Sequence, residues 1–184
     1  MSFLMDVGET LAGLGREVEV DPSTSTLAVE SDLPEEPRLL VLVRQETRAV
    51  TFYAVHPREV PAERVAEVAE LVVRATASEL TVAVELDLDR RTVSARAGLE
   101  LLGTELDGAD LEQLLAVLVI EVESVARCYG PAVDAVVAGE LSPAGAAAAA
   151  RSARQEERFD EAREALAEAE EALRAAQRGA GEGG

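Results

Sequence analysis

The feature that most constrains the fold is a strict alternation of apolar and polar residues between positions 80 and 101. In the first half, the apolar residues occupy every second position: Leu80, Val82, Val84, Leu86 and Leu88. The same spacing resumes after Arg90 and Arg91: Val93, Ala95, Ala97, Leu99 and Leu101. Because alternation with period two is typical of strands with one buried face, the segment predicts an antiparallel hairpin that turns at Arg90 and Arg91. Its register is well specified, since a slip by one residue would bury the intervening acids.

Four shorter segments upstream also have β character. Val18 and Val20 alternate with acids, and Leu27 and Val29 resume the alternation after a turn at residues 21–23. Residues 38–45 and 49–55 are rich in β-branched and aromatic residues, and three residues separate them, which favours a second hairpin. The segment 38–45 is apolar enough to permit a strand that is buried on both faces.

Four segments show the spacing of three and four residues that is typical of helices. They span residues 2–14, 62–77, 110–129 and about 144–177. The third is apolar around much of its circumference, which predicts that more than one side of it is covered. Gly130 and Pro131 predict a break after it, and a short helix over 131–138 follows.

The order of these elements predicts an α+β fold, because helices alternate with antiparallel hairpins. We expect an antiparallel sheet of five to six strands with helices packed on one side, plus a C-terminal helical extension. The predicted division is a domain over residues 1–150 and a charged helical tail over 151–184, whose final RGAGEGG segment is flexible.

The charge of the chain restricts its partners. The chain has 36 acidic residues and 17 basic residues, with a formal net charge of −19. This charge repels phosphate backbones, so nucleic acid is not an expected partner and another protein is. The N-terminal segment carries acids where a secretory signal needs basic residues, and no stretch of about 20 residues is free of charge, so we expect a cytoplasmic protein without membrane insertion.

The candidate chemical groups are isolated. His56 has no recognisable nucleophile motif around it, and Cys128 lies in a helical pattern where a partly buried thiol is common. The acids Glu85, Asp87 and Asp89 share a strand face and permit a cation site, but a solvated outer face explains them as well. We therefore predict no catalytic residue, no metal site and no cofactor, and rank a small enzyme third among the functions considered.

Several segments, in order, resemble the YbjN family of bacterial proteins, which are regarded as sensory-transduction regulators. The matching stretches are GREVEVD, LLVLVRQETRAVTFYAVHP, VPAERVAEVAELVVRA, ELDLDRRTVSARAGLEL and LSPAGAAAA, which together cover roughly residues 3–150. The resemblance implies a fold similar to type III secretion chaperones, frequent homodimers and binding to segments of other proteins.

These observations lead to two hypotheses of function. The first is a non-enzymatic, chaperone-like or adaptor domain whose apolar strand face and helices hold a segment of another protein, by backbone pairing or by a helix in a groove. The alternative is a regulatory domain in bacterial signalling or stress response that changes a partner's activity through the same surface. We also expect a homodimer, because the helix over 110–129 is too apolar for one covered side.

The tail carries a candidate protein interface. Its apolar residues recur at alternating spacings of three and four: Phe159, Ala162, Leu166, Ala169, Leu173 and Ala176. The hypothesis is that Phe159, Leu166 and Leu173 dock on the apolar surface of the same or a sister subunit and cover the place where another protein would bind. The alternative is a solvated, charged helix.

Overall fold

The computed structural model describes residues 2–29, 37–102, 104, 106 and 108–181, with some side chains omitted in the last part of the C-terminal helix. The elements are α1 (Phe3–Gly13), β1 (Val18–Asp21), β2 (Thr26–Val29), β3 (Arg38–Arg44), β4 (Ala49–Val55), a 3₁₀ turn η1 (Ala62–Arg64), α2 (Val65–Thr76), β5 (Ala83–Asp87), β6 (Thr92–Glu100), α3 (Gly108–Ala138) and α4 (Pro143–Gly181).

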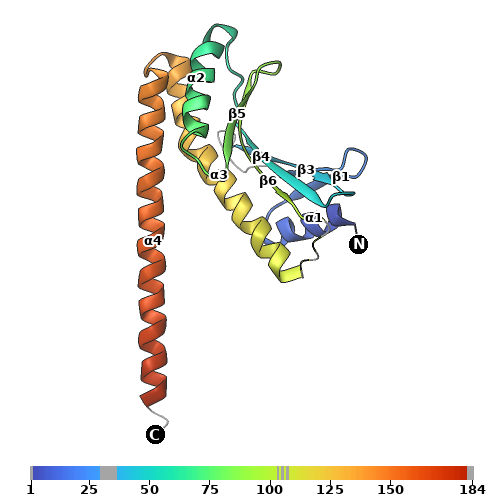
Figure 1. Ribbon diagram of the computed structural model, residues 1–184, viewed down its shortest axis with the longest axis vertical. Helices are drawn as coiled ribbons and strands as arrows, with labels where there is room; N and C mark the ends of the chain where they lie inside the picture. The colour runs from blue at the N-terminus through green and yellow to red at the C-terminus, as the bar shows by residue number, and fades with distance from the viewer. Residues whose placement is uncertain (1, 30–36, 103, 105, 107, 182–184) are drawn as a thin grey trace.

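The strands form one antiparallel sheet in the order β1-β2-β3-β4-β6-β5. Figure 1 shows α1 and α3 on one side of this sheet, α2 near β5, and α4 as a long helix that continues past the rest of the molecule. The predicted α+β architecture with six strands and a C-terminal helical extension is therefore confirmed.

The core lies between the inner face of the sheet and the two helices α1 and α3. Leu11 of α1, Val41 of β3, Phe52 of β4 and Leu115 of α3 are fully buried there. Burial of one such aliphatic or aromatic side chain stabilises the fold by about 1.5–3 kcal/mol. The core is built almost entirely from Val, Leu and Ala, which matches a chain whose aromatic content is 3%.

The predicted register of the 80–101 hairpin is confirmed. Val84 pairs with Ala95 and Leu86 with Val93. Val84 and Ala95 are buried on the inner face, and Glu85 is on the outer face, where it bonds with Arg96 at 2.7 Å. The alternation therefore placed each side chain on the correct face of the central part of the hairpin.

The predicted ends of the hairpin are wrong. The alternation predicts Leu80 and Leu88 on the inner face, but both are exposed because β5 spans only Ala83–Asp87. The carboxylate of Asp87 accepts hydrogen bonds from the backbone N–H groups of Asp89 and Arg90, each at 2.9 Å. These bonds close a four-residue turn over 88–91 in place of a turn at two residues.

Only one face of β3 is buried, although the sequence permits burial of both faces. Leu39, Val41 and Val43 point into the core, whereas Leu40 is half-buried and Leu42 is exposed. The reason is that no helix of the described chain covers the outer face of the sheet at β3.

The predicted break at Gly130 and Pro131 does not occur, because α3 runs without interruption from Gly108 to Ala138. Proline in a helix interior costs about 3 kcal/mol, since it removes one backbone hydrogen bond and crowds the preceding turn. Ala132, Val133 and Val136 follow the proline and are all buried. Their packing offsets the cost of Pro131, which itself lies at the exposed side of the helix.

The connection between α3 and α4 is a tight turn. Gly139 has a backbone φ of +76°, a conformation that L side chains rarely adopt, so a larger residue at this position would be strained. The Ser142 hydroxyl then accepts a hydrogen bond from the N–H of Gly145 at 3.2 Å and caps α4. The helix α4 has 39 residues and extends to Gly181, so the segment expected to be flexible from Arg178 begins as helix.

Candidate functional site

A large open groove lies over the outer face of the sheet. Its volume is about 1180 Å³. It is lined by apolar and polar residues of β3, β4, α2 and the β5–β6 hairpin: Leu40, Leu42, Tyr53, Val55, Val72, Val73, Thr76, Ala77, Val84, Glu85, Leu86, Asp87, Arg90, Thr92 and Ser94. We call this surface the outer groove.

Strand register places the apolar side chains of the outer groove next to one another. Leu40 of β3 is opposite Tyr53 of β4, and these residues share the face that points away from the core. Val72 and Val73 come from α2, and Val73 is 69% exposed. An exposed valine beside a half-exposed aliphatic sheet face is a surface on which another apolar segment can be buried.

The charged groups of the outer groove are already paired. Glu85 bonds with Arg96 across the hairpin at 2.7 Å, and Asp87 pairs with Arg90 at 3.0 Å. The backbone N–H of Arg90, and then its side chain, hold the pKa of Asp87 below its usual value. These acids are therefore occupied by separate partners, as a solvated outer face predicts. In the part of the chain that the structure describes, no group of three or more His, Cys, Asp or Glu side chains is arranged to hold a metal ion.

The two edges of the sheet offer little backbone for strand addition. At the β5 edge, the Thr76 hydroxyl donates to the carbonyl of Val84 at 2.6 Å and accepts from the N–H of the same residue at 3.0 Å. At the other edge, β1 has four residues and carries Glu19 and Asp21. Short, charged or covered edges resist pairing with another chain. The geometry therefore favours burial of side chains in the outer groove over backbone pairing.

The inner apolar face of the sheet, which the sequence suggests as the surface that holds a segment of another protein, is not available. It is covered by α1 and α3. The signal for the outer groove is present in the run RLLVLVR, where Leu40 and Leu42 are apolar at the positions that alternate with the core residues.

His56 has a structural position at the end of β4. Its ring is almost fully buried, its Nδ1 accepts from the N–H of Arg58 at 3.2 Å, and its Nε2 is 3.4 Å from a carboxylate oxygen of Asp134. Asp134 also pairs with Arg58. The imidazole thus connects the loop after β4 to α3, which explains its burial without a catalytic role.

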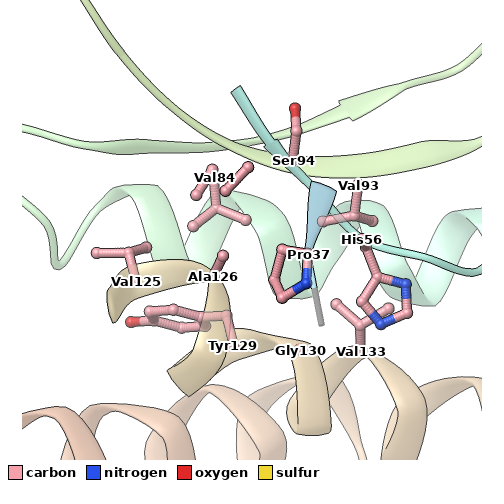
Figure 2. A pocket seen from close by; sticks show the side chains of 12 residues that line it. Pro37, His56, Val84, Val93, Ser94, Val125, Ala126, Tyr129, Gly130 and Val133 are labelled. Carbon is pink, nitrogen blue, oxygen red and sulfur yellow. The ribbon is translucent and has the colours of Figure 1, made fainter. Parts of the chain in front are cut away.

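A small cavity lies beside this histidine, between α3 and the sheet. Figure 2 shows His56, Tyr129 and Val133 around it, with Val84, Val93 and Val125 completing an apolar wall. Its volume is about 20 Å³. This is the space of about one water molecule, so the cavity is too small for an organic substrate.

A polar cluster joins α3 to the first part of α4. Arg154 has a side chain that is 5% exposed, and it bonds to Glu121 at 2.6 Å and to Glu157 at 3.1 Å. Arg154 also bonds to Ser124, whose hydroxyl donates to Glu157 at 2.6 Å. A buried guanidinium held by two carboxylates fixes the position of α4 along α3.

Cys128 lies next to this cluster and is partly buried. Its thiol donates to the Glu157 carboxylate at 3.4 Å. Burial, followed by the nearby Glu157 carboxylate, raises the pKa of the Cys128 thiol to about 11. Such a thiol is mostly protonated at neutral pH and is a poor nucleophile.

Two of the three candidate interface residues of the tail are largely exposed. Phe159 and Leu166 are 60% and 61% exposed, while the side chain of Leu173 lies outside the described residues. A hollow of about 460 Å³ is bordered by Phe159 and Ala162 and by Ser78, Glu79, Arg151, Arg154, Gln155 and Arg158. The predicted domain boundary after residue 150 falls inside α4, and Arg154 beyond it is buried against α3.

Within the residues that the structure describes, no helix is both long enough and apolar enough to cross a bilayer.

The chain resembles known proteins in its three-dimensional structure. No protein-family model and no curated protein sequence matches the chain. Among solved structures, the Yersinia pestis type III secretion chaperone SycH, solved with a stable fragment of YscM2, matches with a TM-score of 0.40 and 16% identity, over 67% of this chain and 99% of that one. YbjN of E. coli, described as a proposed transcription regulator, matches with a TM-score of 0.52 and 17% identity, over 66% of this chain and 86% of YbjN. The chain therefore shares the fold of YbjN, as its sequence motifs predict.

Proposed function

We propose that this protein is a non-enzymatic binding domain of the cytoplasm that holds a segment of another protein in the outer groove. The observation that carries the proposal is the unpartnered apolar surface formed by Leu40, Leu42, Tyr53 and Val55 of the sheet and by Val73 of α2. An unpartnered apolar surface bounded by polar residues is typical of protein interaction sites.

The chemistry of the groove indicates what kind of segment it holds. Alternate aliphatic side chains fit the half-exposed row of Leu40, Leu42, Tyr53 and Val55. The net charge of −19 attracts segments that carry Arg or Lys beside those apolar residues. We therefore expect short, basic and apolar segments to bind, with their side chains and not their backbone supplying most of the contacts.

The test is selection of binding peptides from a random display library with the full chain as bait. The selected peptides are then measured by fluorescence polarisation against Leu42→Glu and Val73→Glu, two changes at exposed groove positions. Leu141→Glu, a change of the same kind at an exposed position outside the groove, is the control. We expect each groove variant to weaken binding about tenfold or more, because a carboxylate would be desolvated, and the control to bind normally.

Two results would contradict the proposal. Peptides whose affinity is unchanged by both groove variants would place the binding surface elsewhere. Selection that yields no peptide dependent on the folded chain would mean that the groove does not hold peptide segments. If a full-length partner captured through the groove changes its own activity on binding, the regulatory alternative is favoured over a chaperone-like role.

A further inference from the structure

A second surface, separate from the outer groove, is formed by α3 and α4. On α3, the side that faces the core is buried, but Leu114, Val117 and Ile120 on the other side are 41%, 53% and 56% exposed. We call these three residues the α3 stripe. They lie on the same side of α3 as Glu121 and Ser124, the residues that contact α4.

The α3 stripe is exposed because α4 leaves α3 before reaching it. The two helices meet near their connection and then diverge toward the free end of α4 (Figure 1). Ala146, Ala147, Ala150 and Arg154 of α4 are buried, whereas nearly all described side chains from Arg158 onward are exposed. Among the described residues, the ion pair farthest along α4 that reaches α3 is the weak one of Arg158 with Glu121 at 3.7 Å.

The distal part of α4 carries an apolar row of its own, which we call the α4 stripe. Its described members are Phe159, Ala162, Leu166 and Ala169, which are all exposed, and the sequence continues the spacing at Leu173 and Ala176. Residues 159–181 span about 35 Å as a helix. A single charged helix of this length is marginal in water, so packing against another helix is needed to stabilise it.

We propose that the α4 stripe of one copy packs against the α3 stripe of a second copy, and that two-fold symmetry repeats the contact. Each chain has both stripes and cannot bring them together itself, because α3 and α4 diverge. An isologous dimer pairs them twice and buries Phe159 and Leu166 beside Val117 and Ile120. The resulting arrangement is a four-helix bundle made of α3 and α4 from both copies.

The charges beside the two stripes favour a second copy as the occupant. Between Gly108 and Ala126, α3 has the acids Asp110, Glu112, Glu121 and Glu123 and no basic residue. In contrast, α4 contains arginines among its acids, and Arg158 and Arg163 border the α4 stripe next to Phe159 and Ala162. Within one chain, Glu121 already pairs with Arg154 and Arg158, and Glu123 pairs with Arg16. Among the described residues, Arg163 has only a long contact of 3.8 Å with Asp160, so it is the arginine that can turn to the acidic α3 of a second copy when the stripes meet. Alternating Ala in the α4 stripe leaves room for close approach of the two helix backbones, and the large residues supply the apolar contacts.

The experiment is sedimentation equilibrium of the full chain across micromolar concentrations. We expect a monomer–dimer equilibrium, in which Val117→Glu on α3 and Phe159→Glu on α4 each raise the dissociation constant about tenfold or more. Both residues are more than half exposed, so both variants should fold, and circular dichroism checks this. Ala167→Glu introduces the same charge at an exposed α4 position outside the stripe and should leave the dissociation constant unchanged.

Three outcomes would overturn the proposal. A monomer at all concentrations removes the second copy as occupant. A dimer that is weakened by Phe159→Glu but not by Val117→Glu means that α4 pairs only with another α4. A dimer weakened equally by Ala167→Glu means that added charge, and not loss of the stripe, causes the effect. The groove variants Leu42→Glu and Val73→Glu leave this equilibrium unchanged, so failure of the dimer and failure of the groove are separate results.

Discussion

At the scale of single residues, Arg154 fixes the position of the first part of α4 on α3. Its guanidinium is buried between Glu121, Ser124 and Glu157, although it lies in a segment whose composition is typical of a solvated helix. A buried ion pair adds little net stability when it forms, but removing one partner destabilises the fold strongly, because the other charge is left buried and unpaired. The cluster therefore specifies where α4 sits on α3, and a truncation in this region must be placed after residue 158 to spare it.

Burial, and then the Glu157 carboxylate of the same cluster, lowers the reactivity of Cys128 by raising the pKa of its thiol. With a pKa of about 11, roughly one thiol in a thousand is ionised at pH 8. We predict that alkylation by iodoacetamide at pH 8 is at least about 100-fold slower than for free cysteine and accelerates as the pH rises toward 11. The Glu157→Gln variant should react faster, because the nearby carboxylate raises the pKa of the thiol.

The alkylation rate is measured by mass spectrometry over a pH series. Glu156→Gln, at the exposed neighbouring position, is the matched control and should follow the wild type. A rate that reaches its plateau below pH 9 would show that the thiol is not held protonated by its surroundings.

At the scale of elements, α3 shows tertiary packing overriding a local signal. Gly130 and Pro131 are typical of a helix end, yet the helix continues because Ala132, Val133 and Val136 are buried beyond them. The Pro131 ring is exposed and contributes no core contact. The helix therefore tolerates the proline at a cost to its stability.

We predict that Pro131→Ala stabilises the protein by about 1–2 kcal/mol. The change restores one backbone hydrogen bond and helix propensity, and the gain is reduced by the greater freedom of the unfolded chain without proline. Urea unfolding followed by circular dichroism measures the difference. Ala138→Ser, at the exposed end of the same helix, is a control that should stay within about 0.5 kcal/mol. Destabilisation by Pro131→Ala would mean that the proline shapes the helix for its contact with α4.

At the scale of the whole molecule, the charge of −19 acts differently on the two proposed interactions. Two copies of an acidic chain repel each other at long range, whereas a basic peptide is attracted. Salt screens both effects.

We therefore predict opposite dependences on salt. Raising NaCl from about 50 mM to about 500 mM should strengthen self-association and weaken binding of basic peptides in the outer groove. Sedimentation and fluorescence polarisation, done in the same buffers, check the two directions. Peptide binding that is insensitive to salt would show that apolar contact alone selects the segment. Self-association that weakens with salt would show that ion pairs between α3 and α4 outweigh the long-range repulsion of the two copies.

The sequence by itself determined the features that depend on neighbouring residues, namely the strand register and the helical segments. The alternation at Val84, Leu86, Val93 and Ala95 determined both the hairpin and its register, because a slip would bury acids. The helical spacing determined α1, α2 and α4, and the order of elements determined the α+β class. The resemblance in the motifs from GREVEVD to LSPAGAAAA anticipated the fold shared with YbjN.

Only the tertiary structure decided which apolar surfaces stay uncovered. The inner face of the sheet is more apolar in sequence than the outer one, but α1 and α3 cover it, and the uncovered face is the one that contains Leu40 and Leu42. Likewise, no local pattern shows that α4 leaves α3 near Arg158 and exposes Val117 and Phe159. Exposure of a side chain depends on which distant elements pack against it. The residues of α3 alone therefore do not show where its contact with α4 ends.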